Sequence, residues 1–146
     1  MQTLLIPTFK TATITAAAAT SQTANLAPGA GDCFQMTVNM TAASGTSPTF
    51  DGVVQTSFDK GSNWISLPLR FTQFTTTGVK YLVFRNGLGN NEVALENAAA
   101  DTGGTLAKNC IFDPQYIRLK YTIGGTSPSF TATVYLGVVH SGALAR

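Results

Sequence analysis

The hexapeptide GTSPxF occurs twice in this chain of 146 residues, as GTSPTF at residues 45–50 and as GTSPSF at residues 125–130. Each copy stands between two runs in which apolar and polar residues alternate, the pattern of a strand with one buried face. The apolar phases of the two copies match when one extra residue is allowed before the first motif. A slip of one residue would invert that phase. The repeat therefore predicts two equivalent β-hairpins.

The alternation also predicts which side chains of the two hairpins face inward. Within each motif, glycine permits a positive φ, and we expect the residue before proline to be extended and to start the return strand. We interpret the motif as a structural turn with no ligand. The predicted inward set is Phe34, Met36, Val38 and Met40, then Phe50, Val54 and Phe58, in the first hairpin, and Ile117, Leu119, Tyr121 and Ile123, then Phe130, Ala132, Val134, Leu136 and Val138, in the second.

The rest of the chain predicts further short strands. Residues 9–16 alternate between alanine or isoleucine and threonine, as in a half-buried strand, and residues 17–32 predict a strand end followed by a loop. Asp59-Lys60-Gly61 predicts a tight turn before a strand that starts at Trp64 and Ile65. Two more strands are expected at residues 69–76 and 79–86.

One segment departs from this strand pattern. Residues 86–108 look like an insertion, and within them residues 92–100 predict one short helix. The domain organisation that follows is an N-terminal arm at 1–8, one domain at 9–139 and a C-terminal tail at 140–146. We expect an all-β fold, an antiparallel β-sandwich or jelly roll with an internal hairpin repeat and at most one short helix.

The composition is poor in charge. Charged residues make up 11% of the chain against the usual quarter, and the net charge is only +2. The lysines and arginines are spread along the sequence without a cluster, so a nucleic-acid partner is not expected. The apolar run at the start is too short for a signal peptide and no stretch reaches membrane-spanning length. We expect a protein made in the cytoplasm with no membrane contact.

Candidate catalytic and metal-binding groups are few. His140 is the single histidine, and no motif places it with a nucleophile and an acid, so we expect no enzyme activity and no cofactor. Cys33 and Cys110 lack the histidine and cysteine neighbours of a zinc site. Two alternatives stay open for them, a disulfide or two partly buried thiols, and a reducing compartment favours the thiols.

The aromatic residues offer two interpretations. Trp64 and the tyrosines at 81, 116, 121 and 135 are able to form a sugar-stacking platform, but most lie in strand patterns that favour packing in or on the sheet. Tyr135 falls on the outward face of the last strand. We therefore expect it at a subunit interface.

Two stretches carry a family resemblance. GTSPTFDGVVQTSFDKGSNW at 45–64 and DPQYIRLKYTIGGTSPSFTATVYL at 113–136 resemble small β-sandwich virion proteins of tailed bacteriophages. The shared pattern is a GTSP turn, a V-x-Q-x-S strand, an Asp-x-Gly turn and an aromatic, then a Tyr-Ile-Arg strand and a second GTSPSF. The residues that fill it here are Val53, Gln55, Ser57, Asp59, Gly61, Trp64, Tyr116, Ile117 and Arg118.

The resemblance implies a capsid decoration (cement) protein. Such a protein would sit as a homo-oligomer, a trimer, on the outer capsid surface of the virion and bridge major capsid subunits. The alternatives are a tail, neck or head-fibre subunit, or a carbohydrate-binding module for host recognition. The residues expected to contact partners are Leu4, Leu5, Ile6, Leu88, Val93, Leu95, Tyr135, His140 and Leu144.

Overall fold

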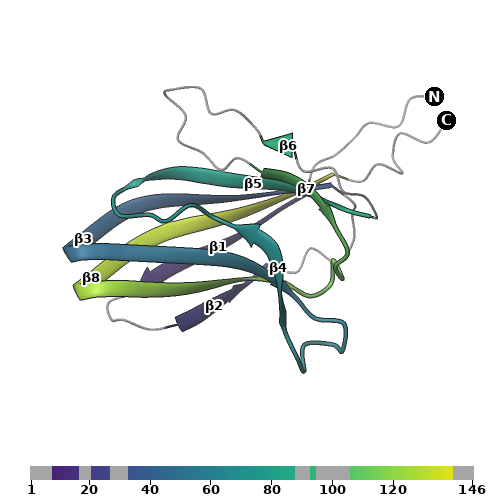
Figure 1. Cartoon of the computed structure of the whole chain (residues 1–146), viewed down its shortest axis with the longest axis horizontal. Helices are drawn as coiled ribbons and strands as arrows, with labels where there is room; N and C mark the ends of the chain where they lie inside the picture. The colour runs from purple at the N-terminus through teal and green to yellow at the C-terminus, as the bar shows by residue number, and fades with distance from the viewer. Residues whose placement is uncertain (1–7, 17–20, 27–32, 88–92, 95–105, 140–146) are drawn as a thin grey trace.

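Two long strands carry the repeat and pair with each other from end to end. In the computed structural model, which describes residues 8–16, 21–26, 33–87, 93–94 and 106–139, β3 spans Cys33–Thr56 and β8 spans Ile117–Val139. Their antiparallel register begins at Cys33 opposite Val139 and ends at Thr56 opposite Ile117. Each strand holds one GTSPxF motif near its middle, and Figure 1 shows both strands bending back there.

The matched repeat is confirmed, but its arms pair differently from those of two separate hairpins. The first arm of β3, residues 33–40, pairs with the second arm of β8, residues 132–139. The second arm of β3, residues 49–56, pairs with the first arm of β8, residues 117–124. The apolar alternation determines which side chains are buried. It does not determine the pairing partner, because any neighbouring arm whose apolar residues have the same phase is compatible with it. The sequence pattern therefore could not identify the neighbour.

The extra residue before the first motif is a β-bulge. The register shifts between Met40, opposite Ala132, and Ala42, opposite Thr131, which leaves Thr41 without a place in the ladder. Thr41 Oγ1 donates a hydrogen bond to the backbone oxygen of Thr131 over 3.1 Å. The bulge adds the one residue that the alignment of the repeats requires.

At the bends the two motifs face each other across an approximate two-fold axis. Gly45 and Gly125 have φ values of 113° and 107°, and Ser47 and Ser127 have values of 50° and 49°. The residue before proline is therefore left-handed, and the expectation that it is extended was wrong. Proline disfavours only the right-handed helical region for that residue, and the left-handed region lets the paired strands reverse together.

Each glycine also lies close to the opposite backbone. A Cβ added at Gly45 would lie 2.7 Å from the carbonyl oxygen of Ser127, and one at Gly125 would lie 2.6 Å from that of Ser47. Real Cβ atoms do not approach so closely, so both positions require glycine for two reasons, the backbone conformation and the space.

The bends fold one sheet into two layers, which Figure 1 shows one above the other. One layer has the order β1, second arm of β8, first arm of β3, β5, β7, β6, and the other has β2, first arm of β8, second arm of β3, β4. The described residues form an all-β, sandwich-like fold and include no helix long and apolar enough to cross a membrane. The remaining strands are β1 (Thr8–Ala16), β2 (Ser21–Asn25), β4 (Ile65–Arg70), β5 (Gly78–Asn86), β6 (Val93–Ala94) and β7 (Leu106–Cys110).

Several expected boundaries need correction. β2 lies inside the expected loop at 17–32, and β5 and β7 pair in parallel, so the sheet is not antiparallel throughout. No separate strand forms at 69–76: Leu69 and Arg70 end β4, which begins at Ile65, and Phe74 makes an isolated bridge to Phe50. Val93–Ala94 belongs to a strand where a helix was expected, and residues 95–100 lie outside the described residues.

The segment after β4 follows an irregular course and is held by a lysine. Lys80 Nζ donates to the backbone oxygens of Thr72 and Gln73 over 3.0 and 2.6 Å and lies 4.4 Å from the centre of the Phe74 ring. The carbonyl groups that accept these bonds would otherwise accept hydrogen bonds from a neighbouring strand. Burial lowers the pKa of Lys80.

The core between the layers contains all but one of the inward residues expected from the sequence, together with side chains from the other strands and loops. Phe34 stacks on Phe84 at 5.4 Å, with Phe112 edge-on to both, while Phe50 contacts Tyr121, Phe74 and Phe130 at 5.2–5.8 Å. Each fully buried phenylalanine contributes about 1.5–3 kcal/mol. The exception is Phe58, which is 57% exposed because β3 ends at Thr56. The buried members of the expected set are Phe34, Met36, Val38, Met40, Phe50, Val54, Ile117, Leu119, Tyr121, Ile123, Phe130, Ala132, Val134, Leu136 and Val138.

Replacing Gly45 or Gly125 by alanine tests the bend. Each change adds a Cβ that meets opposite backbone at a φ unfavourable for alanine, so we expect a loss of about 2 kcal/mol or more in the free energy of unfolding. Urea denaturation measures it. Gly87→Ala is the matched control, since nothing lies within 4 Å of its Cβ position. Equal midpoints for the Gly45→Ala and Gly87→Ala proteins would contradict this account of the bend.

Candidate functional site

The contact residues expected from the sequence lie mostly outside the described part of the chain. Tyr135 is the exception, and it lies as expected on the outer face of β8, 39% exposed, opposite Thr11 of β1 and Thr37 of β3. Val93 lies in β6, at the edge of the same layer. The others, which fall outside the described residues, are Leu4, Leu5, Ile6, Leu88, Leu95, His140 and Leu144.

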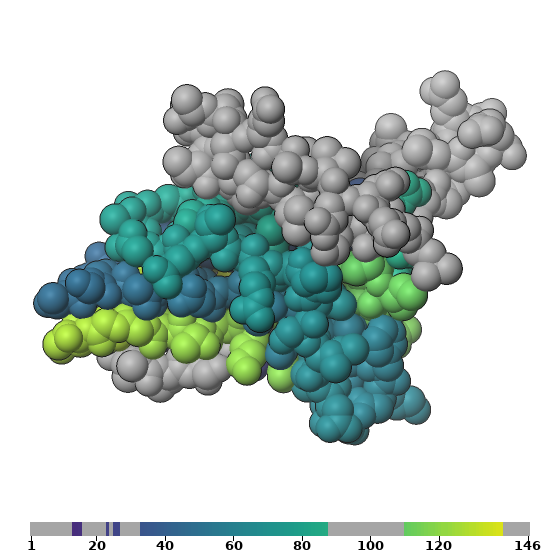
Figure 2. Space-filling model, in the orientation of Figure 1, coloured from purple at the N-terminus to yellow at the C-terminus, as the bar shows by residue number. Residues whose placement is uncertain are grey.

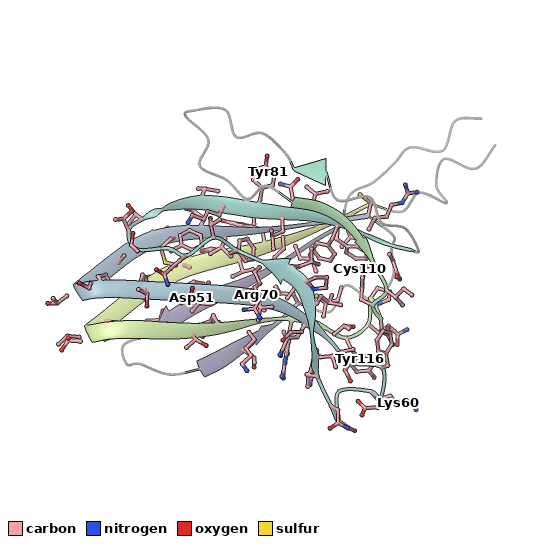
Figure 3. All side chains as sticks on the ribbon, in the orientation of Figure 1. Asp51, Lys60, Arg70, Tyr81, Cys110 and Tyr116 are labelled. Carbon is pink, nitrogen blue, oxygen red and sulfur yellow. The ribbon has the colours of Figure 1, made fainter. Side chains whose placement is uncertain are left out.

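Exposed apolar side chains lie near the strand ends at the end of the sandwich opposite the bends. Phe58, Ile65 and Ile111 are 57%, 52% and 55% exposed, the highest values among the described large apolar residues. Figure 3 labels Lys60, in the turn between β3 and β4, and Cys110, the last residue of β7, at this end. Phe58 follows the end of β3, Ile65 begins β4 and Ile111 follows the end of β7. We call these three residues the apolar end. The sequence missed it because the alternation placed Phe58 inside.

A crossing segment at this end carries Ile111 and is held by hydrogen bonds to both layers. It leads from β7 in one layer to β8 in the other, and the N–H of Asp113 donates to Thr56 Oγ1 over 3.0 Å. Asn86 Nδ2 donates to the backbone oxygen of Phe112 over 3.0 Å, and Asn86 Oδ1 accepts from the N–H of Phe112 over 3.3 Å. These bonds hold the backbone beside Ile111, so its exposed side chain stands on a fixed support.

The turn between β3 and β4 is organised by Asp59, as its position in the sequence predicts. Asp59 Oδ1 accepts from Ser57 Oγ and from the N–H of Asn63, both over 2.7 Å, and Oδ2 accepts from Asn63 Nδ2 over 2.6 Å. The buried Ser57 Oγ accepts from the N–H of Gly61 over 2.8 Å. The turn projects from the body in Figure 2, at the lower right.

These bonds favour the ionised form of the Asp59 carboxyl. The backbone N–H of Asn63, then the side chains of Ser57 and Asn63, lower the pKa of Asp59 from 3.8 to about 2. The turn is thus held by a carboxylate acting as a fixed acceptor, which is a structural task.

Trp64 is the centre of a polar chain on the outer face of the second layer. Its Nε1 donates to the oxygen of Gly61 over 3.0 Å, and the Arg118 guanidinium lies 4.0 Å from the centre of its ring. Arg118 Nε donates to Gln55 Oε1 over 2.9 Å, and Gln55 Nε2 donates to Ser66 Oγ over 3.0 Å. Arg118 therefore covers one face of the ring and links the turn to the sheet.

A shallow depression of about 320 Å³ lies beside Trp64. Gly61, Trp64 and Tyr116 line this depression, and a Cβ added at Gly61, whose φ is 87°, would lie 3.7 Å from both aromatic side chains. Tyr121 thus packs in the core, as the strand pattern favoured, whereas Trp64 and Tyr116 line this depression. The other lining residues are Asn25, Lys60, Gln115 and Ile117.

The outer face of the second layer also brings cations together that the sequence spreads apart. Val53 lies opposite Arg70 of β4 on one side and opposite Lys120 of β8 on the other, and Arg118 lies one row further along β8. The expectation that the basic residues form no cluster was wrong for this face. Strand pairing placed together residues that are far apart in the chain.

The described residues hold no group of three or more potential metal ligands. Cys33 lies opposite Arg85 of β5, which lies opposite Asn109 of β7, the residue before Cys110. Two strand spacings amount to about 9.6 Å, beyond the roughly 7 Å over which a disulfide forms. Both cysteines are half-buried and not joined to each other, in agreement with the thiol alternative.

Comparison with models of known protein families and with curated protein sequences finds no match to this chain.

Acidification tests the role of Asp59. The folded pKa of about 2 lies below the ordinary 3.8, so the stabilisation of the turn is complete above about pH 4 and is lost as the pH falls towards 2. We expect the fluorescence of Trp64, the single tryptophan, to change over that range. In the Asp59→Asn protein this change should disappear, whereas it should persist in Asp51→Asn. The same acid transition in the wild type and in Asp59→Asn would contradict the assignment.

Proposed function

We propose that this protein is a non-enzymatic structural component of a phage particle, a capsid decoration protein that binds the outer surface of the assembled shell. The observation that carries the proposal is the apolar end. Three large apolar side chains stand more than half exposed at one end of the sandwich, and together they offer apolar area for packing against another protein.

The body behind this surface suits a structural task. The hydrogen-bonded ladder of β3 and β8 runs through both layers and joins them at the bends, so the layers cannot separate without breaking it. A protein that binds only the assembled shell stabilises that shell by mass action and needs a stiff body with large contact areas. Few charges on the chain favour contacts dominated by apolar and neutral polar groups.

The residues of the resemblance support this proposal through their structural roles. Asp59 and Gly61 form the turn, and the contact between Trp64 and Arg118 attaches it to the sheet. The residues on which the resemblance to phage virion proteins rests are therefore framework residues. A framework of this kind is equally suited to a tail, neck or head-fibre subunit, which remains the alternative within the virion.

The carbohydrate-binding module is the weaker alternative at Trp64. A sugar ring stacks on an open aromatic face, and Arg118 already covers one face of Trp64.

Removing the apolar end should weaken binding to the shell. We expect the Phe58→Ser, Ile65→Ser, Ile111→Ser triple variant to bind capsids assembled without this protein at least tenfold more weakly, because each lost apolar contact is worth about 1 kcal/mol or more. Sedimentation of the protein with such capsids measures the affinity. Circular dichroism of the unbound variant verifies that the fold is retained.

Val79→Ser is the matched control for this experiment. Val79 is 43% exposed and begins β5 beside the bends, at the other end of the molecule. Saturation of capsids in hundreds of copies with loss only in the triple variant supports the proposal. Absence of binding by the wild type, or binding of about a dozen copies, would refute the decoration role, and the second result would favour the neck or tail alternative.

A further inference from the structure

A hollow of about 210 Å³ lies on the outer face of the second layer, around Val53. It exists because β4 bulges. Gln55 is opposite Ser66, but Val53 is opposite Arg70, so β4 has two residues more than β3 over this stretch. Pro68 stands in the middle of the bulge, on an edge strand where its missing N–H is tolerated. The residues that line the hollow are Asp51, Gly52, Val53, Ser66, Arg70, Phe71, Lys120 and Thr122.

Two cations stand on opposite sides of this hollow. Arg70 and Lys120 are both paired in register with Val53, and directly opposite residues of neighbouring strands project to the same face. Among the described residues neither side chain has a hydrogen-bond or ion-pair partner. Their donors are therefore available to an anionic group, and a guanidinium matches a carboxylate with two parallel bonds.

The hollow also carries groups that suit hydroxyls rather than a bare anion. Gln73 Nε2 donates to both carboxylate oxygens of Asp51 over 3.1 Å, which fixes the carboxylate and leaves lone pairs on each oxygen. Ser66 Oγ accepts from Gln55, so its own hydrogen is available for donation. Figure 3 labels Asp51 and Arg70 on this face. Asp51 gives the hollow an acceptor for a hydroxyl group, which a ligand that carries only a carboxylate would leave unused.

We propose that this hollow binds a sugar acid, a sugar ring that carries a carboxylate. Arg70 and Lys120 hold the carboxylate, and Asp51 accepts hydrogen bonds from ring hydroxyls. The Val53 side chain offers an apolar surface to the C–H face of the ring. The site differs from the Trp64 depression and is independent of the decoration role, because none of its lining residues belongs to the apolar end.

Titration of the full chain with glucuronate, followed by amide NMR shifts, tests the site. We expect saturable shifts at Gly52, Val53 and Phe71. Glucose, which lacks the carboxylate, and acetate, which lacks the ring, should each bind at least tenfold more weakly. Arg70→Gln and Lys120→Gln should weaken glucuronate binding at least tenfold, while Arg85→Gln, a matched change in the other layer, should leave it unchanged.

The Asp51→Asn variant distinguishes the part of the site that binds hydroxyls from the part that binds the carboxylate. It should weaken glucuronate binding and leave acetate binding unchanged or tighter, because it removes an acceptor and a negative charge. The proposal is overturned if glucuronate gives no saturable shifts, if acetate or inorganic phosphate binds as tightly, or if Arg85→Gln weakens binding as much as Arg70→Gln. Tighter binding of a polyglutamate peptide than of glucuronate would assign the hollow to an acidic protein partner and also overturn it. Capsids are absent from this experiment, so neither result bears on the decoration role.

Discussion

The close contact of two glycines with the opposite backbone is the constraint on which the rest of the structure depends. Gly45 and Gly125 approach the Ser127 and Ser47 carbonyl groups so closely that no side chain fits. This contact lets β3 and β8 reverse direction as a pair without separating. The reversal places the apolar faces of all four arms against one another, and the aromatic core follows from it. The alignment of the two layers is therefore determined by this one small region.

The sequence predicted much of the fold because the arms have a strict apolar alternation. Met36, Val38, Leu119 and Val134 are buried as expected, since burial depends only on phase within a strand. The arrangement of arms was not predictable, because all four arms have compatible phases and the choice among them is made by long-range contacts. Short strands such as Val93–Ala94 were missed because their sequences have no alternation of their own and depend on β7 for their pairing.

The surface features were predictable only where they arise locally. The turn of Asp59 follows from neighbouring residues, and the structure agrees with it. The outward position of Tyr135 follows from phase. In contrast, Arg70 and Lys120 are fifty residues apart in the chain and meet only through Val53, so no local pattern could indicate the hollow. The exposure of Phe58 depends on where β3 ends, and the ends of strands are poorly specified by alternation.

The exchange of arms between the two repeats has a consequence for how the chain is made. Both arms of β3 pair with β8, and residues 57–116 separate the two strands in the sequence. During synthesis β3 therefore emerges long before the strand that completes it. Until β8 leaves the ribosome, β4 and β5 are the partners in the sheet that β3 has, and much of its apolar face has to remain exposed. Contacts between such distant segments form slowly, and unpaired strands in the meantime are prone to aggregation. The same repeat that makes the folded protein stiff thus makes the nascent chain prone to aggregation. Before its own β8 is made, the β3 strand of one chain is able to pair with a strand of a second nascent chain instead.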